Sequence, residues 1–210
     1  MIKQLVLKDM MLQRKLSFAY FISLFFLVIV DFRSDSFLMT FSMFVPALGM
    51  ILSMSYEGKN KSELIVNSLP FDRKDIVIGK YIFVSILVAL GGCFSLVVGF
   101  IQLQNEHMTG FMLWGEILGG ITGGFVCSII VLPIEFSVGY NSAKQIAPFV
   151  GIAFGYLSGL IVSNVWLDVE NAWNTSLVVN ICFIAGLILL YIMSMLLSVS
   201  LYNERDLGGE

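Results

Sequence analysis

Charged side chains are scarce in this chain of 210 residues, since Lys, Arg, Asp and Glu together make up only 13% of it. Soluble globular domains carry about 25% charged and about 45–50% apolar residues. Here 58% of the residues are apolar and the mean hydropathy is +0.89. This balance excludes a water-soluble fold and a disordered tail. The net charge of −3 gives no sign of a nucleic-acid partner.

Residues that build metal sites, disulfide frameworks and catalytic centres are few. The single histidine, His107, cannot form a zinc site or a catalytic dyad alone. Cys93, Cys127 and Cys182 lie in apolar stretches without metal-binding spacing or a disulfide pattern. The phosphate-binding motif G-x-x-x-x-G-K-[ST] does not occur, and the glycine cluster at 119–124 lacks a lysine. We therefore expect no enzymatic activity, no metal and no cofactor on this chain.

Long apolar stretches are abundant. They occupy 16–30, 37–56, 81–103, 111–134, 146–167 and 177–202. All but the first reach the roughly 17–25 residues that a helix needs to cross a bilayer. Neither an amphipathic stripe nor the strict alternation of a membrane barrel is present. The pattern predicts an all-α membrane protein with six transmembrane helices in a single domain, 1–210.

Basic residues gather on one side of these predicted spans. Eleven of the 12 Lys and Arg residues fall in the N-terminal segment, in the connections after the second and fourth spans, and after the sixth. Only Arg33 falls on the other side. Because cytoplasmic loops carry the excess of Lys and Arg, we expect both termini in the cytoplasm.

The N-terminal segment, 1–15, has a mixed character. Lys3, Lys8 and Arg14 share one arc of a helical wheel, and Leu5 lies roughly opposite, where Asp9 interrupts the apolar arc. This pattern predicts an interfacial helix in the cytoplasmic leaflet. The alternative is a simple extension of the first span into the cytoplasm. A cleaved signal peptide is not favoured, because no small-residue cleavage site follows the apolar stretch.

The connection between the second and third spans, 57–80, is the longest polar stretch of the chain. A short helix ending before Pro70 exposes Leu64, Ile65 and Val66 to water. These side chains either pack on the ends of the chain's own spans or dock into a groove of another protein. Asp72 and Asp75 then have capping-box spacing, which predicts a helix that begins at residue 73 and continues into the third span.

Here the sequence resembles the permease subunits of type-2 ATP-binding-cassette (ABC) exporters. The resemblance includes the entry segment ending LQRK and the six-span pattern. It is most specific in the element formed by Leu64, Ser68-Leu69-Pro70, Arg73-Lys74, Ile76-Val77 and Lys80. The sequence is similar to peptide and bacteriocin exporters of Gram-positive bacteria, including those that export phenol-soluble modulins.

The resemblance implies a permease in the bacterial cytoplasmic membrane that moves amphipathic peptides or related apolar compounds out of the cell. ATP and Mg would bind to a separate cytoplasmic ATPase, and a second permease subunit would complete the path. Residues 60–68 would form the coupling helix, and the docking residues would be Leu64, Ile65, Val66, Ser68, Leu69 and Pro70. Arg73, Lys74 and Lys80 would lie near the ATPase or the lipid headgroups. The alternative for these three is a role in topology and anionic lipid binding alone.

Small residues recur every four positions in two spans. Gly151, Gly155 and Gly159 in the fifth span would pack either across a permease dimer or against the fourth span. For the glycines of the fourth span, packing within one subunit is favoured. Glu116, near the outer end of the fourth span, either lines the cargo path or extends to the outer headgroups.

Two other classes of function remain open at the level of sequence. An ATP-independent secondary carrier usually shows intramembrane charges or an inverted repeat, and neither is visible here. A membrane protein that confers immunity by binding a peptide without transporting it is the other alternative.

Overall fold

The computed structural model describes residues 2–15, 37–59, 71–104, 110–139, 143, 145, 146, 149 and 177–205. Its helices are α1 (Ile2–Lys15), α3 (Phe37–Lys59), α5 (Arg73–Gln104), α6 (Gly110–Val138) and α8 (Leu177–Glu204). The described part of the chain contains no strand, so the all-α prediction is confirmed there.

Three of these helices are long and apolar enough to cross a membrane. They are the segments Arg73–Ile101, Ile117–Val138 and Ile181–Glu204. The helices α3, α5, α6 and α8 cover the apolar stretches at 37–56, 81–103, 111–134 and 177–202. The predicted spans at 16–30 and 146–167 lie outside the described residues, apart from 146 and 149, so the count of six stays a prediction.

Helix α5 begins where the capping pattern predicts. Its first turn closes on Asp72, whose carbonyl oxygen accepts hydrogen bonds from the amides of Asp75 (2.9 Å) and Ile76 (3.3 Å). The helix then runs from Arg73 to Gln104 without a break. The polar segment after residue 72 and the predicted third span are therefore one continuous helix.

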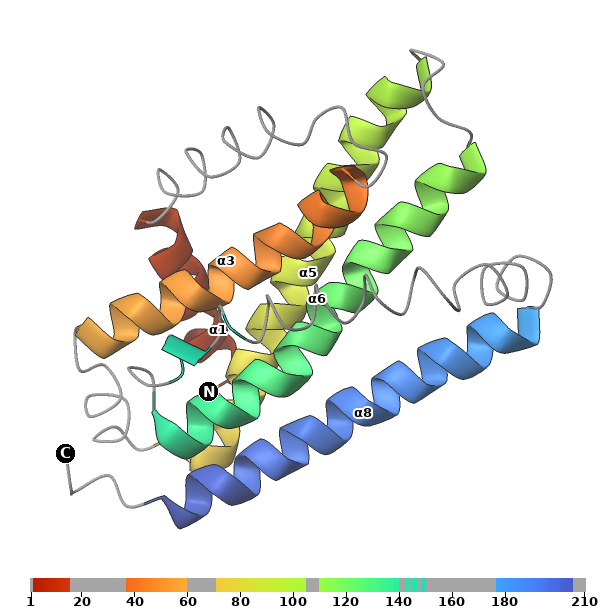
Figure 1. Ribbon diagram of the computed structural model, residues 1–210. Helices are drawn as coiled ribbons and strands as arrows, with labels where there is room; N and C mark the ends of the chain where they lie inside the picture. The colour runs from red at the N-terminus through yellow and green to blue at the C-terminus, as the bar shows by residue number, and fades with distance from the viewer. Residues whose placement is uncertain are drawn as a thin grey trace.

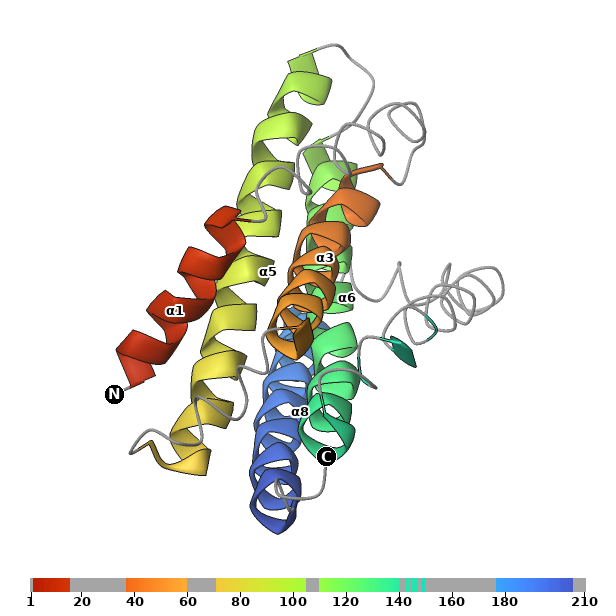
Figure 2. The same ribbon diagram turned by 90° about the vertical axis from the view of Figure 1, so that its left-hand side faces the viewer.

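The four long helices form a bundle, and α1 lies beside α5 at its edge (Figures 1 and 2). Helix α3 packs against α5 and α6, and α8 packs against α6 and α5. The carboxyl ends of α3, α6 and α8 meet the amino end of α5 at one end of the bundle (Figure 1). We call this the basal end. In the sequence, residues 60–72 separate α3 from α5.

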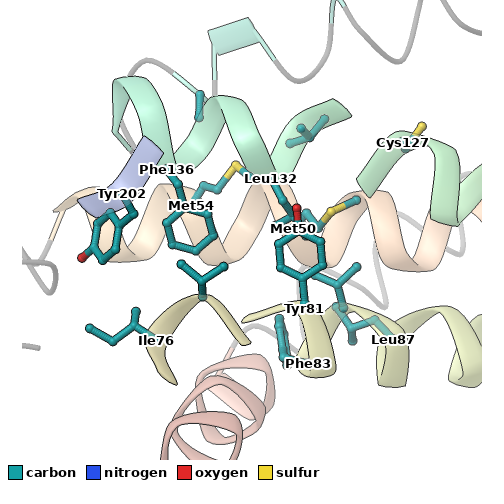
Figure 3. Packing of buried hydrophobic residues seen from close by; sticks show 14 of the residues in the cluster. Met50, Met54, Ile76, Tyr81, Phe83, Leu87, Cys127, Leu132, Phe136 and Tyr202 are labelled. Carbon is teal, nitrogen blue, oxygen red and sulfur yellow. The ribbon is translucent and has the colours of Figure 1, made fainter. Parts of the chain in front are cut away.

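Among the described residues, the buried apolar cluster comes from the parts of the helices nearer the basal end, and Figure 3 shows its packing from close by. Tyr202 of α8 packs edge-on against Phe136 of α6, with ring centroids 5.2 Å apart. Met50 and Met54 of α3 and Tyr81 of α5 belong to the same buried cluster. Burial of such side chains contributes about 1.5–3 kcal/mol each in a water-soluble protein, and in lipid the gain is mainly close packing.

Glycines bring α3, α5 and α6 into close contact. A Cβ atom at Gly91 of α5 would lie 2.7 Å from the carbonyl oxygen of Ser42 on α3. A Cβ atom at Gly124 of α6 would lie 3.1 Å from Pro46 and 3.3 Å from Val88. Gly124 therefore packs within one subunit, as the sequence favoured for the fourth span, although its neighbours are the second and third spans.

Hydroxyl groups attach helix α8 to α5. The Tyr81 hydroxyl of α5 hydrogen-bonds to the hydroxyls of Ser194 (2.8 Å) and Ser198 (2.9 Å). The Tyr191 hydroxyl donates to the carbonyl oxygen of Tyr81 at 2.8 Å. Most large apolar side chains of α8, such as Leu189 and Leu196, remain exposed.

Candidate functional site

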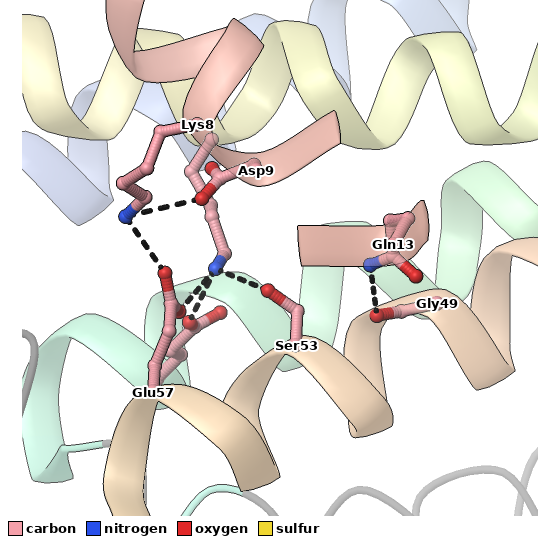
Figure 4. A network of polar contacts seen from close by, with 8 residues as sticks. Lys8, Asp9, Gln13, Gly49, Ser53 and Glu57 are labelled. Atoms are coloured by element: carbon pink, nitrogen blue, oxygen red, sulfur yellow. Dashed lines mark hydrogen bonds and ion pairs between the residues drawn. The ribbon is translucent and has the colours of Figure 1, made fainter. Parts of the chain in front are cut away.

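At the basal end, four helices contribute to a cluster of charged and polar side chains, of which all but Lys8 are buried. Its members are Lys8, Asp9, Ser53, Glu57, Lys80 and Glu135, which we call the Lys80 cluster. Figure 4 shows Lys8 and Asp9 of α1 turned toward Glu57 and Ser53 of α3. Buried ionic groups are costly unless they are paired, so their gathering at one point needs a specific arrangement of helices.

Lys80 is the centre of this cluster. Its ammonium donates to Glu57 Oε2 at 2.5 Å and to Ser53 Oγ at 3.0 Å, and both acceptors belong to α3. It also lies 3.4 Å from Glu135 Oε1 on α6. Lys80 is only 4% exposed and Glu57 only 2%. One ammonium of α5 therefore joins α3 and α6 in the interior of the bundle.

Helix α1 enters the cluster through neighbouring side chains of opposite charge. Lys8 Nζ lies 3.0 Å from Glu57 Oε1 and 3.1 Å from Asp9 Oδ1. Burial lowers the pKa of Lys8, but the attraction of Glu57 and Asp9 outweighs it, so the pKa lies above its ordinary value. Burial raises the pKa of Asp9, and the attraction of Lys80 only partly offsets this.

The absence of a Cβ atom at Gly79 lets α1 approach α5 beside this cluster. A Cβ atom at Gly79 of α5 would lie 3.2 Å from the Cβ atom of Leu5 on α1. Further along α1, the Gln13 side chain donates to the carbonyl oxygen of Gly49 on α3 at 3.1 Å. Helix α1 is therefore packed against the bundle on one face, while Leu7, Met10 and Met11 stay exposed.

Glu135 is the least satisfied member of the cluster. It is 1% exposed, and neither of its carboxyl oxygens has a hydrogen-bond partner among the described residues. The cluster thus contains three carboxyl groups and two ammonium groups, with Lys80 alone facing Glu135.

No group of three or more acidic, histidine or cysteine side chains in the described part of the chain is arranged to hold a metal ion.

A second charged contact at the basal end involves Arg73. Its Nη1 atom donates to the carbonyl oxygens of Tyr202 (2.8 Å), Asn203 (3.0 Å) and Arg205 (3.1 Å). Its guanidinium also lies over the Tyr202 ring, 5.6 Å from the centroid. The last carbonyl groups of an α-helix lack an amide partner in the next turn, so a cation that binds carbonyls at this end caps α8.

The structure separates the three basic residues that the sequence grouped together. Lys74 is exposed, as expected of a residue available to a partner or to lipid headgroups. Arg73 is half-buried and caps α8. Lys80 is buried in the cluster, so it is not an exposed basic contact. The sequence placed Lys80 at the water-facing edge of the third span, but the ends of α3 and α6 cover it.

Other candidate residues from the sequence fall where the structure gives no side-chain information. The docking residues at 64–66 and 68–70 and the glycines at 151, 155 and 159 lie outside the described residues. Glu116 lies in α6, but its side chain is also outside them. Their roles stay predictions.

Sequence reasoning missed most of the Lys80 cluster. Asp9 looked like an interruption of an apolar arc, and Glu57 and Glu135 each lie just past the end of a predicted span. The available signal was the pair of carboxylates directly at span ends, opposite a lysine just before a third span. Side chains at such positions commonly face the bundle interior and pair there.

Comparison with known proteins gives one match. The family model described as "ABC-2 family transporter protein" matches residues 4–203, almost the whole chain. No curated protein and no solved structure matches.

Proposed function

The chain belongs to the ABC-2 family of transporter proteins, and from this membership we propose that it is the permease of an exporter driven by a separate ATPase. Family membership supports a multi-pass permease subunit that lacks the ATPase domain and works with an ATPase and a second permease subunit. We propose further that segment 60–70 docks into the ATPase, that the basal end faces the cytoplasm, and that the cargo is an amphipathic peptide.

The observation that carries the docking proposal is the position of the two helix ends that flank the segment 60–70. Helix α3 ends at Lys59 and α5 begins at Arg73, both at the basal end. This end also contains the exposed Lys74 and the carboxyl end of α8. A loop with apolar residues at 64–66 between these two helix ends is suited to a partner's groove.

Purification from native membranes tests the permease role. We expect the affinity-tagged chain to retain an ATPase that carries the phosphate-binding motif. Leu64→Asp and Ile65→Asp should each release it, because a carboxylate is costly in an apolar groove. Met11→Asp is the matched control, since it makes the same change on an exposed apolar residue of α1. If the unsubstituted chain retains no such ATPase, the permease proposal fails. Retention by Leu64→Asp and Ile65→Asp would refute only the docking assignment.

Labelling of introduced cysteines tests the orientation. In a chain whose three cysteines are replaced by alanine, Lys59→Cys and Asn203→Cys both lie at the basal end. An impermeant maleimide should label them only after the cells are lysed, whereas His107→Cys should react in intact cells. Labelling of Lys59→Cys in intact cells would show the opposite orientation.

The proposed cargo follows from where the charges lie. Among the described residues, the buried charges gather at the basal end, and the middle of the bundle has hydroxyl and apolar groups. Such a lining suits amphipathic or apolar compounds better than ions or sugars. The purified complex in proteoliposomes should hydrolyse ATP faster with an amphipathic helical peptide than with a scrambled peptide of equal composition. Equal rates with the two peptides would contradict this cargo class.

A further inference from the structure

The two helices that flank the segment 60–70 are joined to each other inside the protein. Glu57 lies in the last turn of α3 before this segment, and Lys80 lies two turns into α5 after it. The ammonium of Lys80 and the carboxylate of Glu57 are in direct contact. The helices on either side of the segment are therefore held together by this ion pair.

The same ion pair extends to two other helices. Lys8 of α1 contacts the second oxygen of Glu57 at 3.0 Å, and Glu135 of α6 lies 3.4 Å from Lys80. At the basal end, α1, α3, α5 and α6 thus share one set of charges. A displacement of α3 or α5 that separates these charges weakens the pairing of buried groups, which is strongly unfavourable.

Stability alone is a poor explanation for this arrangement. Replacing a buried ion pair by well-packed apolar residues is often neutral or stabilising. Close contacts further along the bundle, at Gly91 and Gly124, already hold α3, α5 and α6 together. What the ion pair adds is a directional constraint on the relative position of the helix ends.

We propose that Lys80 is a positioning residue for transport, which makes the basal ends of α3, α5 and α6 move as one body when the ATPase moves segment 60–70. This inference rests on the proposed function. Without Lys80, the segment and α3 would follow the ATPase while α6 remained behind. The bundle would stay folded, because the glycine contacts are unaffected.

Distance measurements between spin labels test the proposal. Labels are placed on Lys59→Cys at the end of α3 and Val138→Cys at the end of α6, both exposed, in a chain whose native cysteines are replaced by alanine. The purified complex with its ATPase is measured without nucleotide and after trapping with ATP and vanadate. With Lys80 present, we expect the same narrow distance distribution in both states.

Lys80→Met should leave the nucleotide-free distance unchanged and shift it by at least about 1–2 Å in the trapped state, the size of helix shifts in switching proteins. Lys80→Arg should restore the nucleotide-independent distance, since it keeps the charge. Glu57→Gln, a milder change, should show the same shift as Lys80→Met and guards against misfolding of that variant. Lys74→Met, on the exposed neighbouring lysine, is the matched control and should behave like the parent chain.

Two outcomes would overturn the inference. A distance that stays constant in both Lys80→Met and Glu57→Gln would show that the ion pair is not needed for joint movement. If the distance distribution of Lys80→Met and Glu57→Gln is already broadened without nucleotide, the ion pair has a purely structural role. Failure of the unsubstituted chain to retain an ATPase is a separate result, which counts against the proposed function and thereby against this inference.

Discussion

The guanidinium of Arg73 closes the carboxyl end of α8 by donating to the carbonyl oxygen of Tyr202 at 2.8 Å, across 129 positions of sequence. Arg73 is also the first residue of α5 after the segment 60–70. The start of one long helix is therefore attached to the end of another at the basal end.

Loss of this cap should weaken the fold. Arg73→Ala removes hydrogen bonds to three carbonyl oxygens and the contact with the Tyr202 ring, so we expect a loss of about 1–3 kcal/mol. Arg73→Lys should recover only part of the lost stability. The ammonium still donates to carbonyl oxygens, but it cannot stack on the ring as a guanidinium does. Thermal unfolding in detergent micelles measures both. Lys74→Ala is the adjacent exposed control, and an equal loss there would contradict the assignment.

The two buried glutamates should differ sharply in their response to neutral substitution. Glu57 accepts contacts from Lys8 at 3.0 Å and Lys80 at 2.5 Å, so Glu57→Ala leaves a buried ammonium poorly paired and should cost about 3–5 kcal/mol. Glu135 has one longer contact and no hydrogen-bond partner among the described residues, so Glu135→Gln should cost less than Glu57→Ala. Unfolding midpoints of the two variants check this order, and the reverse order would show that Glu135 is the main partner of Lys80.

The raised pKa of Asp9 predicts a pH-dependent effect. A folded-state pKa above the ordinary value of 3.8 means that the folded protein binds this proton more tightly than the unfolded chain. The ionised carboxylate thus destabilises the fold at neutral pH, and the cost disappears as the pH falls below the unfolded value. Asp9→Asn should raise the unfolding midpoint at pH 7, with a gain that shrinks as the pH approaches about 4. Asp72→Asn, on an exposed carboxylate, is the control and should give no such gain. A lower unfolding midpoint for Asp9→Asn at pH 7 would contradict the prediction.

Close helix contact should make two glycines respond oppositely to alanine. A Cβ atom at Gly91 would meet the carbonyl oxygen of Ser42 at 2.7 Å, so Gly91→Ala must separate α3 from α5 and should cost about 1–3 kcal/mol. A Cβ atom at Gly186 of α8 meets nothing within 4 Å. Gly186→Ala should leave stability unchanged or raise it, because alanine favours the helix. Similar unfolding midpoints for the two variants would show that α3 and α5 are not in close contact at Gly91.

The sequence predicted individual helices well because their signals are local. The helix at Phe37, the start at Arg73 after Asp72 and the helix at Leu177 each follow from apolar length or capping chemistry within a few residues. The segment at 1–15 also forms the predicted helix α1. None of these inferences required knowledge of which helix lies beside which.

The Lys80 cluster was not predictable in the same way, because it depends on neighbour relations between distant segments. Lys80, Glu57 and Glu135 all lie at the edges of apolar stretches, where periodicity assigns a charge to water by default. Only the packing of α3 and α6 on α5 covers these edges. Asp9 shows the same point, since an apparent defect in an apolar arc is a residue of the buried cluster.

The hydroxyl contacts of α8 have a consequence for how the protein is assembled during synthesis. Tyr81 and Arg73 of α5 contact α8, and α5 leaves the ribosome earlier than α8. Ile129 of α6 also precedes α8, and its carbonyl oxygen accepts a hydrogen bond from Ser194 at 2.8 Å. The residues that receive α8 are therefore synthesised before α8. A rotation of α8 by one residue, about 100°, would turn Ser194 and Ser198 away from Tyr81. The contacts with α5 and α6 thus fix the rotation of α8 about its axis, and these contacts are made to helices that were synthesised before it.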